Sequence, residues 1–140
     1  IESTDMTGAI LAGVRSGEVN EGWLPSKLPA GWKVYRYFIG PGADLRGAQL
    51  QHSTLNNFNF SGADLTGADL SGSQLSANFS YANCTNANLS SSSMSGISVV
   101  GGIFTGANLT NIVGSDNVGP PAALPTGWRW AGDRFSQIVP

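Results

Sequence analysis

The stretch GADLTGADLSGSQLSANFSYANCTNANLS, residues 62–90, repeats one short motif: a small residue, a polar residue and then a large apolar one. The large residue recurs every five positions, at Leu65, Leu70 and Leu75, and then after four positions, at Phe79. Five-residue spacing then resumes. This period fits neither the turn of a helix nor the two-residue alternation of a strand. It predicts instead a coil made of short sides, each built around one inward-pointing large residue.

The same spacing continues on both sides of this stretch and covers residues 43–110. A small residue stands two places before most of the large ones, and Phe58 and Ile97 are the exceptions. We expect the large central residues to fill the interior and the small residues to let the corners close. The predicted structural core consists of Leu45, Leu50, Leu55, Phe60, Leu65, Leu70, Leu75, Phe79, Cys84, Leu89, Met94, Val99, Phe104 and Leu109.

This pattern resembles the pentapeptide-repeat family, whose consensus is Ala-(Asp/Asn)-Leu-X-X. The resemblance implies an all-β fold, a right-handed four-sided parallel β-helix (solenoid) with four units per coil. Central residues about 20 positions apart would then share a column, and Phe60 and Phe79 would fall in one column. Stacking within such columns would set the register of the coils. The four-residue step would therefore remove one corner residue while the columns stay aligned.

The segments that flank the array resemble each other. LPAGW at 28–32 follows TGAILAG at 7–13, and LPTGW at 124–128 follows TGANLTN at 105–111. Aligning Leu11 with Leu109 indicates a longer repeat of about 98 residues. The chain therefore looks like part of a larger tandem protein.

The flanks are expected to close or join the ends of the solenoid. We divide the chain into the end of a preceding repeat unit (1–14), a Trp-containing linker or hairpin cap (15–42), the β-helix (43–112) and a second Trp-containing linker or hairpin cap (113–140). KVYRYFI, residues 33–39, has the β-branched and aromatic content of a strand. A solenoid end exposes strand edges and apolar core, so it needs a cap. The predicted cap residues are Trp23, Trp32, Trp128 and Trp130.

Composition limits the function classes. The net charge of −2 gives no basic field for nucleic acid, and charged residues make up only 11% of the chain. No stretch approaches the roughly 20 apolar residues of a membrane-spanning helix, so no membrane partner is expected. Cys84 is the only cysteine, which excludes a disulfide within the chain. The compartment stays open, since bacterial cytoplasm and cell surface both fit.

No motif for catalysis or for a cofactor is present. Cys84 occupies a central position, where it is expected to replace Leu as a buried small apolar residue. A reactive thiol needs exposure and a basic neighbour, and the only histidine, His52, falls at a corner in a different part of its coil. We therefore expect no catalytic residue, no metal ligand and no cofactor, and we predict that the protein is not an enzyme.

The predicted function is structural: a rigid, uncharged spacer or protein-interaction module, used in tandem within a longer bacterial, phage or cell-surface protein. Its partners would be proteins or neighbouring repeat units of the same chain. One alternative follows from the resemblance, because pentapeptide-repeat proteins of the quinolone-resistance type are thought to mimic duplex DNA and bind DNA gyrase. Mimicry needs carboxylates spaced like phosphates. Between residues 43 and 110, however, the only charged residues are Asp44, Arg46, Asp64 and Asp69.

A second alternative is a surface that binds ice or glycan. The outward residues that follow the central ones form columns of small hydroxyl residues, such as Thr66, Thr85 and Thr105. Only one column is consistently Thr, and Ser and Thr also suit a solvated, close-packed sheet face. We therefore favour the structural interpretation of these columns.

Overall fold

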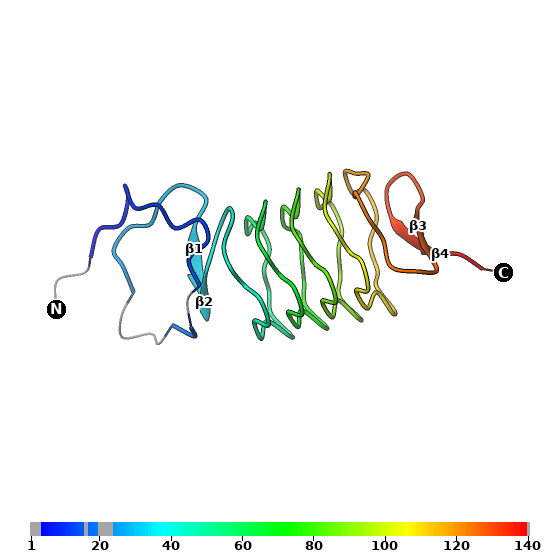
Figure 1. Cartoon of the computed structure of the whole chain (residues 1–140), viewed down its shortest axis with the longest axis horizontal. Helices are drawn as coiled ribbons and strands as arrows, with labels where there is room; N and C mark the ends of the chain where they lie inside the picture. Colours follow the sequence, from blue (N-terminus) through cyan, green and yellow to red (C-terminus); the bar gives the residue numbers. More distant parts are fainter. Residues whose placement is uncertain (1–3, 16, 20–23, 140) are drawn as a thin grey trace.

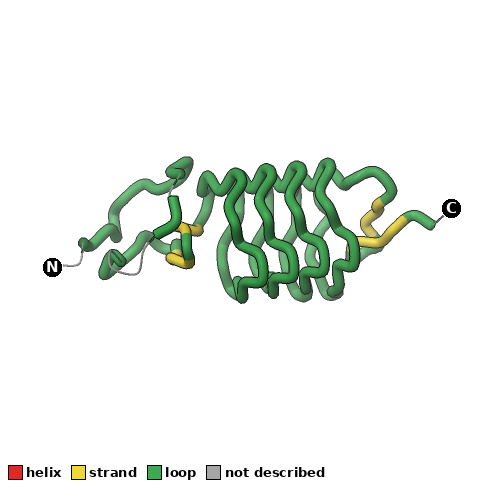
Figure 2. Tube along the Cα trace, turned by 90° about the horizontal axis from the view of Figure 1, so that it is seen from below, coloured by secondary structure: helices red, strands yellow, loops and turns green. Residues whose placement is uncertain are grey.

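The computed structural model describes residues 4–15, 17–19 and 24–139. The chain forms an elongated stack of coils and runs from one end of the stack to the other (Figure 1). A short antiparallel hairpin lies near each end of the stack, and the described residues contain no helix (Figure 2). No segment among them could therefore cross a membrane as a long apolar helix.

The coils are joined by isolated parallel β-bridges rather than by long strands. Each bridge in the array connects the residue just before one central residue to the equivalent residue 19 or 20 positions later. Four columns of bridges begin at Asp44, Gln49, Thr54 and Asn59. The longest column connects Asp44, Asp64, Asn83, Ile103 and Ala123. The four columns of bridges correspond to the four sides per coil that the family resemblance implies.

A left-handed backbone marks the corners of the array. The second residue after nearly every central residue has a φ between 55° and 68°, as in Gly67 (66°) and Asn86 (57°). Glycine adopts this conformation freely, whereas other residues lose about 1–2 kcal/mol. After Leu75 this residue is missing, because Ala77 is already the buried small residue of the next unit. The four-residue step therefore deletes the left-handed corner, and the bridge from Asn59 to Asn78 keeps the columns aligned.

The interior is filled by the central side chains. All fourteen predicted core residues are at most 2% exposed. The rings of Phe60 and Phe79 stack with centroids 4.8 Å apart and planes 15° from parallel, as their shared column predicts. Ile97, one of the two exceptions to the small-residue rule, is fully buried. Phe58, the other exception, is half-buried and packs against the Phe60 ring.

The bridges continue beyond residue 112, the predicted end of the array. Val113, Val118 and Ala123 are bridged to the coil before them. The central positions of the first two of these sides are Gly114 and Gly119, which carry no large side chain. The five-residue rhythm of large residues therefore ends before the backbone ladder does.

A two-stranded antiparallel hairpin stands at each end of the array. β1 (Lys33–Tyr35) pairs with β2 (Tyr37–Ile39), and β3 (Trp128–Trp130) pairs with β4 (Phe135–Gln137). Arg36 alone connects the first pair of strands, with a φ of 51°. Both hairpins contribute side chains to the buried cluster that contains the central residues.

Candidate functional site

Each Asp or Asn that directly precedes a central residue accepts a hydrogen bond from the backbone N–H two residues on. The Oδ1 atom of Asp64 accepts hydrogen bonds from the Thr66 N–H (3.0 Å) and hydroxyl (2.6 Å). Asn83 binds Thr85 in the same way, at 3.1 and 2.6 Å. Asp and Asn favour this local bond to the backbone two residues on, because it imitates a backbone turn. The Asp/Asn of the motif is therefore a turn-forming residue.

Side chains of successive coils are also connected along the outer surface. The amide of Asn88 donates to Asp69 Oδ1 (3.2 Å), and that of Asn108 donates to Asn88 Oδ1 (3.3 Å). Much of the hydrogen-bonding capacity of this column is thus engaged inside the protein. The surface offers few free polar groups there for a partner.

Arg46, the one cation between residues 43 and 110, pairs with carboxylates of the first two coils. Arg46 lies 2.7 Å from an Asp44 carboxylate oxygen and 3.9 Å from one of Asp64. The hydrogen bond from the Arg46 side chain is the main cause that lowers the pKa of Asp44 to about 2. Asp44 and Asp64 share one bridge column, but Ile103 ends its polar run with a half-exposed apolar side chain. This column is therefore a poor imitation of a phosphate backbone.

Cys84 and His52 do not form a catalytic pair. Cys84 is fully buried, and burial raises the pKa of its thiol far above the ordinary value. The exposed His52 lies at a left-handed corner against the backbone of Gly72 on the next coil. Within the described part of the chain, no cluster of three or more His, Cys, Asp or Glu residues could hold a metal ion.

A shallow groove of about 490 Å³ lies where the four-residue step shortens the corner. Its lining includes Phe58, Asn59, Ser76 and Asn78. The Phe58 ring is already covered by the Tyr35 ring at 6.4 Å and by the Lys33 ammonium at 5.0 Å. The groove therefore presents amides and hydroxyls but no free aromatic face for a sugar.

The predicted cap tryptophans lie beside the array ends rather than inside them. Trp32, Trp128 and Trp130 are partly buried and pack against the core cluster. The Trp32 ring covers Gly40, and the Trp130 ring covers Gly119, so closely that a Cβ on either glycine would overlap it. Trp23 lies outside the described residues.

Two residues outside the predicted core and cap sets also close the interior. Ile39 is fully buried at the start of the array. At the other end Phe135 packs edge-on against Phe104, with ring centroids 5.1 Å apart, and against Trp130 at 5.5 Å. Both could have been recognised as core candidates, because each is a large apolar residue in a strand-like segment that follows a Trp. Neither, however, continues the five-residue spacing.

Backbone hydrogen bonds connect the segment before the first hairpin directly to the segment after it. Residues 11–15 lie beside residues 42–46, and we call this contact the N-terminal joint. The Gly13 N–H donates to Gly42 O (2.7 Å), and the Asp44 N–H donates to Val14 O (3.3 Å). The backbone of Gly42 approaches the Ala12 methyl so closely that a Cβ there would lie 3.2 Å from it.

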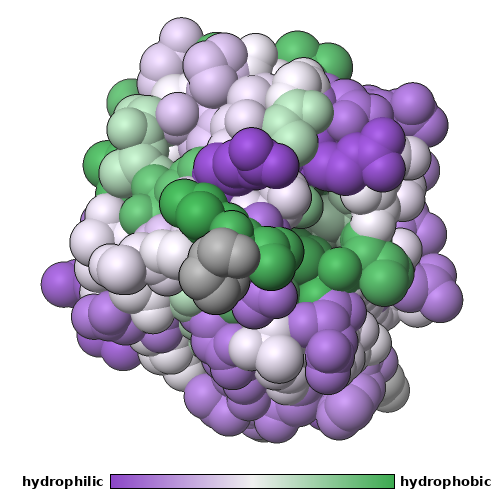
Figure 3. Space-filling model, turned by 90° about the vertical axis from the view of Figure 1, so that its right-hand side faces the viewer, coloured by the Kyte–Doolittle hydropathy of each residue, from purple (hydrophilic) through white to green (hydrophobic). Residues whose placement is uncertain are grey.

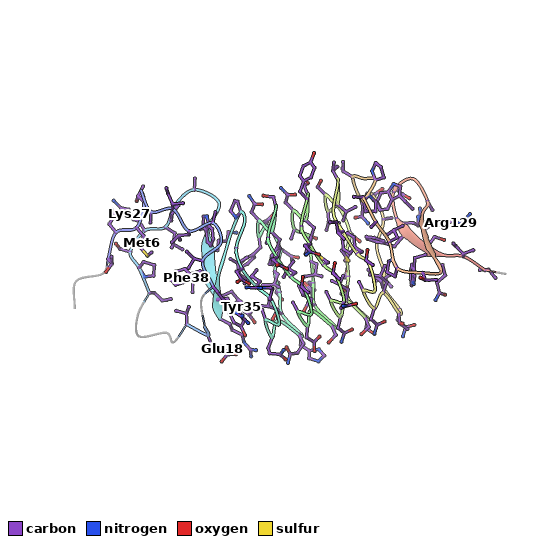
Figure 4. The ribbon with its side chains drawn as sticks, in the orientation of Figure 1. Met6, Glu18, Lys27, Tyr35, Phe38 and Arg129 are labelled. Carbon is purple, nitrogen blue, oxygen red and sulfur yellow. The ribbon has the colours of Figure 1, made fainter. Side chains whose placement is uncertain are left out.

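The N-terminal segment repeats the backbone of the last coil, as the 98-residue repeat indicates. The Met6 N–H donates to Lys27 O (3.0 Å), just as the Phe104 N–H donates to Ala123 O (2.9 Å). Met6 and Lys27 lie together at the N-terminal end in Figure 4. Matching bonds recur in both copies, as do the bridges Asp5–Lys27 and Ile103–Ala123. Residues 4–14 therefore correspond to residues 102–112.

Comparisons with known proteins identify the repeats. The family model for pentapeptide repeats matches residues 43–77 and 76–96, with 8 copies. Among curated proteins no match was found. One similar solved structure is a pentapeptide repeat protein from the thylakoid lumen of Arabidopsis thaliana, with 19% identity over 53% of this chain and 63% of that chain and a TM-score of 0.23.

Another similar structure is HetL, a pentapeptide repeat protein involved in heterocyst differentiation regulation from the cyanobacterium Nostoc sp. strain PCC 7120. Its identity to this chain is 25%, over 62% of this chain and 51% of HetL, with a TM-score of 0.27. The match thus spans less than two thirds of either solved chain.

Proposed function

We propose that this chain, which belongs to the pentapeptide-repeat family, is a rigid non-catalytic spacer or protein-interaction module within a longer tandem protein. The family implies a right-handed, four-sided β-helix. The observation that carries the proposal is the unbroken set of parallel bridges from Asp44 to Ala123. In a solenoid each coil contacts only its neighbours, so continuous stacking makes one stiff body.

Stiffness follows from how each coil is held. Every central side chain from Leu65 to Leu89 has column neighbours on both sides, and burying one such side chain stabilises by about 1.5–3 kcal/mol. Backbone hydrogen bonds such as Leu70 N–H to Asn88 O (2.8 Å) connect the coils between these side chains. Bending the rod would have to break both kinds of contact at once. The expected role is therefore mechanical.

A non-catalytic role is supported by the family and by the chemistry of the surface. Pentapeptide-repeat proteins are generally structural or interaction modules. In this chain the Asp and Asn side chains of the motif are engaged in their own turns, as at Asp64 and Asn83. The one thiol is buried. We propose proteins or neighbouring repeat units as partners, and neither nucleic acid nor membrane.

DNA mimicry is the weaker proposal for this chain. Asp44 and Asp64 flank a single Arg46, and Asp69 is the one further carboxylate of the array up to residue 110. A phosphate track needs roughly one charge per 1.7 Å of duplex axis. The ice- or glycan-binding alternative has no further support, since the Thr66 and Thr85 hydroxyls both donate to neighbouring side chains.

Rigidity can be measured with spin labels on introduced cysteines, because buried Cys84 does not compete for the label. Thr54 and Val113 are exposed and belong to one bridge column, three coil steps apart. At about 4.8 Å per step, Thr54→Cys/Val113→Cys should give a narrow distance distribution near 14 Å. Thr54→Cys/Gln74→Cys, one step apart, is the matched control. A broad distribution for the distant pair and a narrow one for the control would contradict a rigid rod.

The gyrase alternative has its own test. Excess protein is expected to leave DNA supercoiling by gyrase unchanged. Inhibition that disappears in the folded double variant Asp64→Asn/Asp69→Asn would refute the spacer proposal in favour of mimicry.

A further inference from the structure

The N-terminal joint shows what lies on the last coil of one array when another array follows it. There Gly13 and Val14, on the coil side equivalent to residues 111–112, are hydrogen bonded to Gly42 and Asp44 of the next array. The equivalence is supported by the shared bonds of residues 4–14 and 102–112. Thus Val14 N–H donates to Leu11 O (3.0 Å), and Ile112 N–H donates to Leu109 O (3.2 Å).

The equivalence between the two copies extends to the hairpins. Val19 N–H donates to Arg36 O at the turn of the first hairpin, and Asn117 N–H donates to Asp133 O (3.1 Å) at the turn of the second. Both hairpins therefore stand at the same place relative to the coil that precedes them. The space beside the second hairpin corresponds to the space that residues 42–46 occupy beside the first.

The same edge is open at the C-terminal end. We call residues 109–113 the C-terminal edge. Asn111 has the left-handed φ of Gly13, 56° against 75°, but its N–H has no hydrogen-bond partner among the described residues. Ile112 O, equivalent to Val14 O, likewise accepts no hydrogen bond from them. Unpaired strand edges of this kind are templates for another strand.

Two exposed apolar residues lie at or beside this edge, next to the exposed polar residues Thr110 and Asn111. Val113 is 60% exposed and Val118 is 59% exposed, where the coil before carries Ser93 and Ser98. Figure 3 shows a band of hydrophobic residues across this end of the molecule, and the exposed Ile138 and Val139 follow the second hairpin. Exposed apolar residues beside an open edge are typical of an interface.

We propose that the C-terminal edge docks the first coil of a second copy of this repeat unit, through the bonds that Gly13 and Val14 make in the N-terminal joint. In this docked arrangement the Asn111 N–H donates to the backbone carbonyl oxygen of residue 42 in the second copy. The Asp44 N–H of the second copy donates to Ile112 O. The docking proposal rests on the proposed tandem spacer and identifies the partner of that spacer as the next repeat unit. The occupant is a coil fused in sequence, because in a free copy residues 42–46 are already covered by residues 11–15 of the same copy.

A two-unit protein tests the docking directly. It consists of the whole chain followed by a second copy of residues 42–139, so that Pro140 precedes Gly42 as Pro41 does in the native sequence. Isotope labelling confined to the first unit isolates its Asn111 amide. Hydrogen exchange of this amide should be at least about 100-fold slower in the two-unit protein than in the single chain.

Thr110 supplies a specific variant. It is exposed, and it is equivalent to Ala12, which lies against Gly42 in the N-terminal joint. Thr110→Arg in the first unit should therefore restore fast exchange at Asn111. Thr105→Arg, on the neighbouring side of the same coil, is the matched control and should leave the slow exchange intact.

Equal exchange of Asn111 in both proteins would overturn the docking proposal, and so would equal effects of the two Arg variants. A second array that stays unfolded would also contradict it, because docking is expected to close its open end. None of these results touches the spacer proposal as long as the Asn88 amide of the first unit stays protected. Loss of that protection in the single chain would refute the spacer instead.

Discussion

In the middle of the array each central side chain packs between two others of its own column, whereas at the C-terminal end side chains of the second hairpin also cover the interior. Leu70 lies in a column with Leu50 below and Leu89 above, all fully buried or nearly so. Phe104 lies in its column between Cys84 and the partly buried Leu124, and Phe135 of β4 covers its ring edge-on. The middle is therefore specified by repetition, and the ends are specified by single residues outside the repeat.

The largest loss of stability is expected when a central residue in the middle of the array is replaced by a charged one. Leu70→Asp buries a carboxylate without a partner, and we expect a loss of more than about 4 kcal/mol of unfolding free energy, enough to prevent folding. Circular dichroism and labelling of the Cys84 thiol measure the effect, because that thiol is buried only in the folded chain. Gln74→Asp, on the exposed face, is the control. A folded Leu70→Asp protein with an unreactive Cys84 would contradict the column account.

At an end of the array, replacing the hairpin residue that covers the interior should cost less unfolding free energy than a charge in the middle. Phe135→Ala removes the ring that covers Phe104, and we expect a cost of about 3 kcal/mol in urea unfolding. Ile138→Ala, in the same segment but 56% exposed, should change stability by no more than about 0.5 kcal/mol. Equal effects of the two changes would mean that Phe135 is not part of the core.

Corner length should matter less than either kind of packing. Insertion of one Gly between Ser76 and Ala77 restores the missing corner residue and leaves the Phe60–Phe79 stack in its column. We expect a change below about 1 kcal/mol, because glycine adopts the left-handed conformation freely. Insertion of Gly between Asn88 and Leu89 instead turns the central residue outward and should unfold the coil. If both insertions were equally disruptive, corner length rather than stacking would set the register.

The smallest effect is expected from the surface charges. The Arg46 hydrogen bond lowers the pKa of Asp44 to about 2, so its stabilising contribution is present above about pH 4 and is lost as the pH falls through 2. Arg46→Ala should raise the pKa of Asp44 toward its ordinary value and slightly lower the thermal midpoint at neutral pH. Carboxyl titration by NMR measures the shift. An unchanged Asp44 pKa would show that the ion pair does not form in solution.

The sequence predicts the middle of the molecule well because one physical rule repeats there. Large residues at five-residue spacing identify the interior, and the four-residue step at Leu75 to Phe79 follows from the need to keep columns aligned. The residue missing between Leu75 and Phe79 is the left-handed corner residue. Its loss shortens the corner but leaves both central side chains in their columns. Each of these features depends only on neighbouring coils, so periodicity is sufficient to predict it.

The ends are less accessible to this reasoning. The prediction relies on large central residues. The sides with Gly114 and Gly119 at their central positions therefore could not be recognised from the spacing. Phe135 and Ile39 enter the core from hairpins whose spacing is unrelated to the repeat. The contact of Gly13 with Gly42 depends on how a whole hairpin folds between them, and no local pattern encodes that distance.

Residue-resolved hydrogen exchange of the single chain tests the central claim, that stacked columns hold the middle and single residues hold the ends. We predict the strongest protection at the Leu70 and Asn88 amides, which lie inside the stack, weaker protection in both hairpins, and fast exchange at Asn111. Protection that is strongest in the hairpins, or an Asn111 amide as slow as that of Asn88, would contradict the account.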